Sequence, residues 1–286
     1  MTVPADESAD HSADHSAPAT ADTLPSALDA PAVARRLDGR RPAVFLDYDG
    51  VLTPIVPRPE DAVMTDGMRA ILRSLAGRCS VCIVSGRDRA VVEELSGVDD
   101  LVIAGSHGFD IWDPQRGAIE HEASRGWEDL VAEVTQRVQV AAADIEGTQV
   151  EPKHASVALH DRHVAADERP RVAALVDEVL AEHPGQLRVT PGKFVHEIQP
   201  KIDWNKGKAV DHLIGVLDLD HPDIVPIYLG DDITDEDAFR ALARRETPGL
   251  GVLVIDPADA AGRETAATAV LATVDEVGRF LDGLAR

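Results

Sequence analysis

Two carboxylates, Asp47 and Asp49, follow an apolar segment that has the length and composition of a buried strand, residues 42–46. Side chains two positions apart in an extended strand point to the same side of the chain, so both carboxylates can reach one bound group. A carboxylate can attack a phosphoryl group and form an acyl phosphate, which divides a difficult displacement into two steps. The pattern predicts Asp47 as a covalent nucleophile and Asp49 as the acid that protonates the leaving oxygen and later deprotonates water.

A second acidic cluster follows another apolar run far along the chain. Residues 224–229 are apolar, and residues 230–235 then read Gly-Asp-Asp-Ile-Thr-Asp. Clustered carboxylates repel one another, and an all-oxygen ligand set favours Mg2+ as the cation that relieves this repulsion. The expected ligands are the side chains of Asp47 and Asp231 and the backbone carbonyl of Asp49. The remaining carboxylates of the cluster, Asp232 and Asp235, are expected to support these ligands.

A transferring phosphoryl group also needs hydrogen-bond donors and positive charge, and two residues are candidates to supply them. Ser85 ends the apolar run 81–84 and precedes a glycine and a helix, so it offers a hydroxyl group and the amides of a helix start. Lys206 lies where another helix begins, and Lys208 is a rival for the same role. An isolated lysine is usually a solvated surface charge, but the acidic site gives these two a partner.

The elements that must position these residues follow from the spacing of apolar side chains. Short apolar runs alternate with segments of helical period, and the runs lie at residues 44–46, 81–84, 101–104, 224–229 and 251–255. Such alternation predicts an α/β fold with a doubly wound, mostly parallel sheet. Ligands of open α/β sheets bind at the carboxyl ends of the strands, so the polar residues there are expected to line one crevice.

The middle of the chain has a different pattern, and its start has almost no pattern at all. Helices are expected near residues 128–145 and 171–182, and paired strands at 149–159 and 187–198. This order predicts an inserted α+β cap over residues 113–200, with the core formed by residues 29–112 and 201–286. Residues 1–28 are rich in Ala, Asp, Ser and Pro, and they are predicted to form a disordered acidic tail.

Composition limits the classes of partner. The 286 residues carry a formal net charge of -23, so neither nucleic acid nor an anionic membrane is an expected partner. No apolar stretch has the length of a membrane span, and no basic segment precedes an apolar one at the start, so a cytoplasmic location is expected. Cys79 and Cys82 lie in a strand-like segment and are expected to be packing residues. No oligomeric state is predicted.

In their order along the chain, these motifs resemble the haloacid dehalogenase superfamily of phosphatases. Residues 47–53 match the first motif, Ser85 the second, Lys206 the third and residues 230–235 the fourth, and the likeness covers most of residues 41–256. The resemblance implies a haloacid dehalogenase-like core, Mg2+ as cofactor and an aspartyl-phosphate route.

Further motifs in and beside the expected cap are similar to those of the trehalose-6-phosphate phosphatases. They are Gly-Ser-His-Gly at 105–108, Glu-Pro-Lys-His-Ala-Ser at 151–156, His-x-Arg at 160–162 and Gly-Lys-x-x-x-Glu-Ile-x-Pro at 192–200. This resemblance implies hydrolysis of trehalose 6-phosphate, a small sugar phosphate, to trehalose and phosphate. A disaccharide needs several placed donors and acceptors. The candidates for binding it are Gly50, His107, Lys153, His160, Arg162, Lys193 and Glu197.

Three alternatives remain open at the level of sequence. The same chemistry could act on another sugar phosphate, such as sucrose phosphate or a glycosyl phosphoglycerate, because pocket shape sets that choice. The hypothesis that the protein is a mutase has less support, because no feature of the sequence indicates that the phosphoryl group returns to a second position on a sugar. A noncatalytic phospho-acceptor switch also uses acidic strand ends, but such domains are usually much shorter, lack a cap and have no need of an acid at Asp49.

Overall fold

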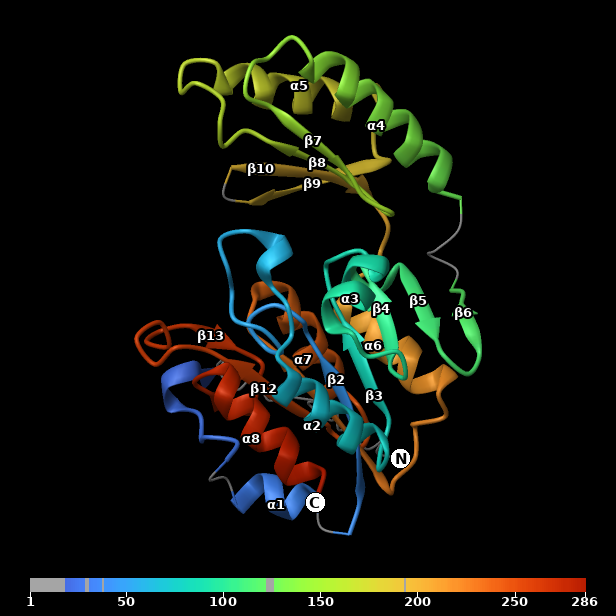
Figure 1. Cartoon of the computed structure of the whole chain (residues 1–286), viewed down its shortest axis with the longest axis vertical. Helices are drawn as coiled ribbons and strands as arrows, with labels where there is room; N and C mark the ends of the chain where they lie inside the picture. The colour runs from blue at the N-terminus through green and yellow to red at the C-terminus, as the bar shows by residue number, and fades with distance from the viewer. Residues whose placement is uncertain (1–18, 29–30, 38, 122–125, 193) are drawn as a thin grey trace, which may run out of the picture.

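The computed structural model describes residues 19–28, 31–37, 39–121, 126–192 and 194–286. Within these residues an eight-stranded sheet forms the core, and a four-stranded antiparallel sheet with two helices lies above it (Figure 1). The lower unit holds the acidic motifs, and the upper unit is the inserted block expected from the sequence.

The core sheet is mostly parallel, as the apolar runs predict. Its strands lie in the order β14 (Ala269–Leu271), β12 (Leu250–Val254), β11 (Ile224–Gly230), β2 (Arg41–Leu46), β3 (Val81–Val84), β4 (Val102–Gly105), β5 (Asp110–Asp113) and β6 (Gly117–Ile119). The first six are parallel, whereas β5 and β6 extend one edge as an antiparallel hairpin. The acidic strands β2 and β11 are neighbours near the middle.

Helices cover both faces of this sheet because successive side chains of each buried strand point to opposite sides. On one face Val44 and Leu46 share a core with α2 (Asp66–Ala76) and α8 (Val274–Leu284). On the other face Phe45 packs in a core with α6 (Lys206–Val216) and α7 (Glu236–Ala243). Two shorter helices complete the core, α1 (Pro31–Leu37) and α3 (Arg89–Ser96). The fold is therefore doubly wound.

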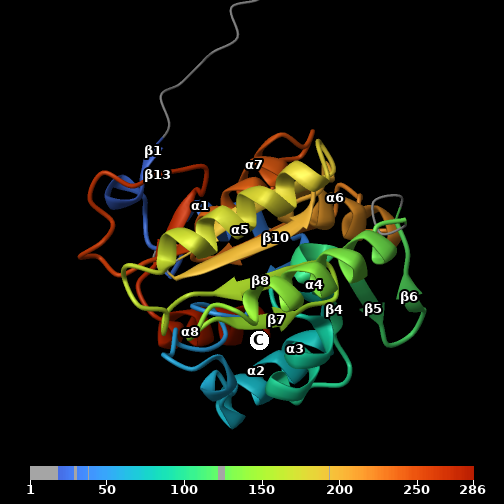
Figure 2. The same cartoon turned by 90° about the horizontal axis from the view of Figure 1, so that it is seen from above.

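The cap has the predicted order of helix, hairpin, helix and hairpin. Its elements are α4 (Glu128–Ala142), β7 (Gln149–Pro152), β8 (Val157–His160), α5 (Arg169–Glu182), β9 (Leu187–Gly192) and β10 (Val195–Pro200). Val157 and Leu159 of β8 and Ile198 of β10 are buried against the two helices. The opposite face of the sheet is turned toward the core, with α4 and α5 on the outside (Figures 1 and 2). Alternate cap residues therefore face the carboxyl edge of the core sheet.

Two boundaries differ from those expected. The core continues past residue 112, because β5 and β6 belong to its sheet and the inserted unit begins only after them. Residues 19–28 are also part of the core: β1 (Ala19–Thr20) pairs with β13 (Glu264–Thr265), and the small side chains of Ala21 and Ala27 are buried. Backbone pairing and buried alanines produce no periodic pattern of large apolar residues, so the sequence does not indicate that this segment belongs to the core. Residues 1–18 of the expected tail lie outside the described residues.

In the described part of the chain, no helix combines the length and the hydrophobicity needed to cross a membrane. Cys82 is buried in β3, and Cys79 packs beside the core just before that strand; both are free thiols. Burial raises the pKa of Cys79 to about 11, so this thiol is protonated at neutral pH. Both cysteines act as packing residues, as expected.

Candidate active site

The carboxyl edge of the core sheet brings the two acidic motifs together. β2 and β11 are paired in parallel with Leu46 opposite Leu229, so Asp47 follows one strand beside the start of the second cluster. The backbone N–H of Asp47 donates to the carbonyl oxygen of Leu229 at 2.9 Å and extends this pairing. Asp47, Asp231 and Asp235 each offer a carboxylate oxygen within 4.8 Å of the others. The predicted convergence of the two motifs is therefore present.

Lys206 is the cation of this cluster. Its side chain is only 2% exposed, and Nζ donates to Asp47 Oδ2 and to Asp235 Oδ1, at 2.7 Å in both cases. Lys208 points elsewhere, since its Nζ donates to the backbone oxygen of Asp203 and pairs with that residue's carboxylate. Lys206, and not Lys208, is therefore the lysine that binds the acidic cluster.

Asp235 is a fully buried anion that organises the second motif. Besides Lys206 it accepts hydrogen bonds from the hydroxyl of Tyr228 at 2.6 Å and from the backbone N–H groups of Asp231 and Asp232, both at 2.9 Å. Asp232 is exposed, and its carboxylate accepts from the N–H of Ile233 at the start of the following helical turn. Asp235 and Asp232 therefore hold the loop that carries Asp231, and their support of a metal ligand stays a prediction.

The cluster carries more negative than positive charge, so it suits a divalent cation. Burial, and then the charge of Asp235, raises the pKa of Asp231 to about 7. Burial also raises the pKa of Asp47, although Lys206 opposes it. Burial alone would lower the pKa of Lys206, but the charges of Asp47 and Asp235 outweigh it and raise that pKa. Carboxylate oxygens are the ligands that Mg2+ prefers, and Asp47 and Asp231 would hold it.

Mg2+ affinity is expected to fall as the pH drops below about 7. A proton on Asp231, whose pKa is raised to about 7, must leave before the carboxylate can bind the metal. Each pH unit below that pKa should therefore weaken the apparent Mg2+ affinity about tenfold for this one group. Calorimetric Mg2+ titrations across this pH range measure the effect. An affinity that does not change with pH would contradict the assignment of Asp231 as a ligand.

Asp49 does not join the cluster but pairs with an arginine that the sequence analysis did not single out. Arg87 Nε and Nη2 donate to the two carboxylate oxygens of Asp49 at 2.6 and 2.7 Å. Arg87 Nη1 also donates to the carbonyl oxygen of Pro59, and the guanidinium lies 5.8 Å from the ring centre of Tyr48. The hydrogen bond to Asp49 raises the pKa of Arg87. Because the carboxylate is engaged, only the backbone carbonyl of Asp49 remains a candidate metal ligand.

Gly50 lies directly against the carboxylate of Asp231. Its φ is +70°, and a Cβ atom built on it would lie 2.1 Å from Asp231 Oδ2. The absence of a side chain lets the backbone of the first motif approach the second motif this closely. Gly50 is therefore part of the acidic site, whereas the sequence predicted it as a substrate contact.

Replacing Gly50 by alanine is expected to displace Asp231 and to weaken Mg2+ binding, with a loss of stability of about 1–3 kcal/mol. Gly39 is a matched control, because its φ is +71° but no atom lies within 4 Å of the Cβ position. Gly39→Ala should lose the stability that a positive φ costs an alanine, but it should not lose the further stability that the collision with Asp231 costs at position 50. Chemical unfolding and Mg2+ titration of both variants measure the difference. Equal Mg2+ affinity in the two variants would contradict the contact.

Ser85 and His107 form the floor beside the cluster, at the ends of β3 and β4. Ser85 is buried, and its hydroxyl oxygen accepts from the N–H of Arg87 at 3.1 Å. The N–H of His107 donates to the carbonyl oxygen of Ser85 at 2.8 Å. Burial, and then the charge of Lys206, lowers the pKa of His107 to about 4. His107 therefore presents a neutral imidazole above the core sheet.

The cap candidates fall into two groups. Lys153 and Glu197 lie 3.4 Å apart, and the hydroxyl of Ser156 donates to Glu197 at 2.7 Å. Burial alone would raise the pKa of Glu197, but Lys153 and Ser156 lower it. The charges of Lys153 and Glu197 also act on His107, so these candidates gather over the core site.

The remaining cap candidates are not joined to that group by the contacts seen here. His160 Nε2 lies 2.9 Å from a carboxylate oxygen of Glu151 on the neighbouring strand. Arg162 is exposed in the turn after β8. Lys193 lies outside the described residues. Their predicted roles in sugar binding therefore stay predictions.

Comparison with known proteins identifies the family. The family model described as trehalose-phosphatase matches residues 45–274. A trehalose-phosphate phosphatase of Mycobacterium tuberculosis is 39% identical over 267 residues, which cover 92% of this chain and 66% of that protein. The chain belongs to the trehalose-phosphatase family. Its fold is haloacid dehalogenase-like, as the resemblance implied.

Two further relatives define how far the likeness of this trehalose-phosphatase chain extends. The C-terminal domain of C. albicans trehalose-6-phosphate phosphatase is 25% identical, with a TM-score of 0.69, and the match covers 94% of this chain and 99% of that one. An uncharacterized glycosyl hydrolase of M. tuberculosis is 42% identical over 93% of this chain, but the match covers only 20% of that protein. The chain thus spans between a fifth and about two thirds of the length of these mycobacterial relatives.

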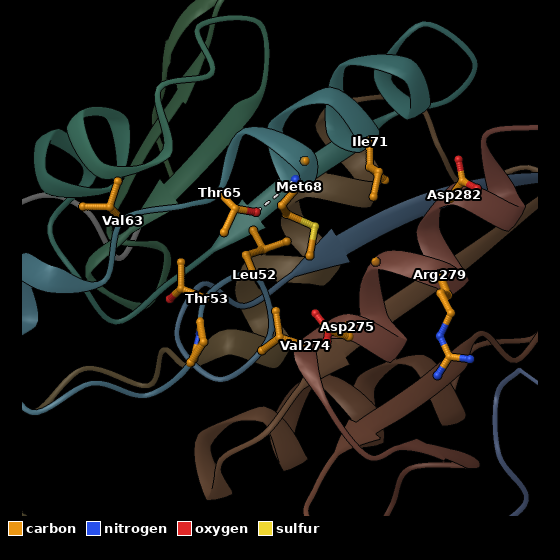
Figure 3. Close-up of a pocket in the computed structure, with 13 residues that line it drawn as sticks. Leu52, Thr53, Val63, Thr65, Met68, Ile71, Val274, Asp275, Arg279 and Asp282 are labelled. Carbon is orange, nitrogen blue, oxygen red and sulfur yellow. Dashed lines mark hydrogen bonds between the residues drawn. The ribbon is translucent and has the colours of Figure 1, made fainter.

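A groove of about 760 Å³ lies elsewhere on the core of this trehalose-phosphatase chain (Figure 3). Its walls come from α2, α8 and the loop that follows the first acidic motif, and they include Leu52, Met68, Ile71 and Val274. None of the residues assigned to the phosphoryl site lines it. The candidate active site is therefore the carboxyl edge of the core sheet beneath the cap.

Proposed function

We propose that the chain hydrolyses trehalose 6-phosphate to trehalose and phosphate, with Mg2+ and through an aspartyl-phosphate on Asp47. The observation that carries this proposal is the Asp47 carboxylate at the end of β2, bound by the buried Lys206 and grouped with Asp231 and Asp235. Family membership supports the sugar phosphate as substrate. The face of the cap turned toward this site supplies Lys153 and Glu197, which suit the hydroxyl groups of a disaccharide.

In the first step a carboxylate oxygen of Asp47 attacks phosphorus, and the bond from phosphorus to the sugar oxygen breaks. Lys206 holds Asp47 in place and offsets the charge of the phosphoryl group. Asp49 donates a proton to the leaving sugar oxygen. A bound Mg2+ would be held by Asp47 and Asp231 and would neutralise charge on the phosphoryl oxygens. Trehalose then leaves, and the phosphoryl group remains on Asp47.

Asp49 must carry a proton before it can act as an acid, but both of its carboxylate oxygens accept hydrogen bonds from Arg87. We assign this pair to the enzyme before substrate binds. The phosphoryl group brings negative charge that competes with Asp49 for the guanidinium of Arg87. Asp49 is then released, takes up a proton from solvent and donates it to the leaving oxygen. In later turnovers this proton is the one that Asp49 accepts from the attacking water.

In the second step water attacks phosphorus, Asp49 accepts the proton of that water, and the bond between phosphorus and Asp47 breaks. Phosphate leaves and the Asp47 carboxylate is restored. The cap face above the site limits access of water while the phosphoryl group passes from the sugar to Asp47. Phosphorylated sugars are charged and do not cross bilayers unaided, so we propose the cytoplasm as the place of this reaction.

A substrate panel tests the proposal. Phosphate release with Mg2+ is measured for trehalose 6-phosphate, sucrose 6-phosphate, glucose 6-phosphate and an aryl phosphate, with Asp47→Asn as the blank. The highest kcat/KM is expected for trehalose 6-phosphate. Preference for another sugar phosphate would leave the proposed reaction mechanism intact but would contradict trehalose 6-phosphate as the substrate. Absence of release that depends on Asp47 would overturn the catalytic proposal itself.

A further inference from the structure

The loops after β3 and β4 are tied into one platform beneath the cap. The N–H of Ser106 donates to the carbonyl oxygen of Arg87 at 2.7 Å, and the N–H of His107 donates to that of Ser85 at 2.8 Å. A Cβ atom on Gly86 would lie 2.7 Å from the His107 ring. Two hydrogen bonds and this close contact therefore fix residues 85–88 relative to residues 105–108.

Asp88 precedes a helix, but its side chain does not make the hydrogen bond that is usual at this position. It is the residue before α3, where an aspartate side chain ordinarily accepts a backbone N–H of the first helical turn. Asp88 makes no such capping bond. Its Oδ1 instead accepts from the hydroxyl of Ser106 at 2.5 Å, and its Oδ2 accepts from the backbone N–H of His154 in the cap at 3.0 Å. One carboxylate thus joins the platform to the cap.

The cap residue that Asp88 holds lies within the substrate-facing turn, residues 153–156. The N–H of Lys153 donates to the carbonyl oxygen of Ser156 at 2.9 Å and closes this turn. The side chains of Lys153 and Ser156 both bind Glu197 on the cap sheet. The ring of His154 also packs edge-on against Trp127, with ring centres 5.3 Å apart. Fixing the backbone of His154 therefore fixes the group that faces His107.

We propose that Asp88 is a positioning residue that selects the substrate, by fastening the cap turn 153–156 over the phosphoryl site. It lies three residues after Ser85, so a single loop carries the hydroxyl at the phosphoryl site and the anchor of the sugar-facing turn. A substrate with a sugar beyond its phosphate depends on this fastening, whereas a small aryl phosphate does not reach the cap contacts. The inference rests on the proposed function, because it concerns the same site.

The test compares Asp88→Ala with the matched control Asp110→Ala in the full chain. Asp110 is also a half-buried carboxylate near the start of α3, but its ion pair in the described structure is with Arg89 of the core. Steady-state kinetics with Mg2+ are measured on trehalose 6-phosphate and on an aryl phosphate. Loss of a charge-assisted hydrogen bond predicts a fall in kcat/KM for trehalose 6-phosphate of about tenfold or more in Asp88→Ala, mainly as a higher KM. The aryl phosphate should change less than about twofold, and Asp110→Ala should leave both values near wild type.

A second variant, Ser106→Ala, removes the platform side of the link and leaves Asp88 in place. It should lower the preference for trehalose 6-phosphate in the same direction, which keeps the inference testable if Asp88→Ala folds poorly. An equal fall for both substrates, or no change in either, would overturn the positioning role. If the wild-type chain prefers another sugar phosphate, the proposed function fails separately, and the same comparison is made with that preferred substrate.

Discussion

Replacing Asp47 by asparagine is expected to lower kcat for phosphate release by about 10⁴-fold or more, because the amide cannot form the acyl phosphate. The fold should survive. The amide oxygen of asparagine can still accept the hydrogen bond that Lys206 Nζ donates to Asp47 in the wild-type chain at 2.7 Å. Phosphate release and the circular dichroism spectrum, measured on the same preparation, separate a chemical defect from a folding defect.

The control for this substitution is Asp66→Asn, which changes a carboxylate whose side chain is 99% exposed at the start of α2. It should leave kcat near the wild-type value. Residual activity of Asp47→Asn above about one hundredth of wild type would mean that another group attacks phosphorus, because loss of a nucleophile costs far more than that. The aspartyl-phosphate route would then have to be abandoned.

Replacing Lys206 by methionine is expected to abolish activity and also to destabilise the fold by about 3–5 kcal/mol in the absence of Mg2+. Methionine fills similar space but leaves Asp47 and Asp235 buried without the ammonium that now binds both. Burial already raises the folded-state pKa of Asp47, and loss of the Lys206 charge that opposes this shift should raise it further. A carboxyl group whose pKa is higher in the folded state than in the unfolded state binds its proton more tightly when the chain is folded. The stability that this proton contributes is lost as the pH rises through the folded-state pKa. The defect should therefore be smaller at about pH 5 than at about pH 8.

Urea unfolding of the variant at these two pH values, with and without Mg2+, measures the effect. Lys208→Met is the matched control, because Lys208 lies two residues further on and its side chain is 44% exposed. Its stability should stay within about 0.5 kcal/mol of wild type. Mg2+ should restore part of the stability lost in Lys206→Met. A variant as stable as wild type at every pH would contradict the role of Lys206 as the cation of the cluster.

The two acidic motifs of the site could be predicted from sequence because each of them follows a buried strand. The apolar runs before Asp47 and Asp231 fix both strands in the sheet, and parallel strands bring their carboxyl ends to one edge. The order of the cap elements was also predictable from the change of hydrophobic period. Val157 and Leu159 alternate with the smaller or polar residues Ser156, Ala158 and His160, as expected of a strand with one covered face.

Other features depend on contacts that spacing does not encode. Arg87 lies two residues after Ser85, but nothing in its neighbourhood indicates that its guanidinium meets Asp49, 38 positions earlier. The link from Asp88 to the cap depends on how the two units are docked. Gly50 belongs to the first motif and was predicted as a substrate contact, whereas its contact with Asp231 arises from the approach of two backbones. Such contacts are set by tertiary packing and produce no recognisable pattern in the local sequence.

The central claim, that Asp47 takes the phosphoryl group from trehalose 6-phosphate, is tested most directly by trapping the intermediate. Enzyme turning over trehalose 6-phosphate with Mg2+ is quenched in acid, and the mass of the intact chain and of its peptides is measured. The account predicts one added phosphoryl group on the peptide that contains Asp47, and none in Asp47→Asn. Phosphate release with no phosphorylated chain in the quenched samples, or a phosphoryl group on a different residue, would contradict it.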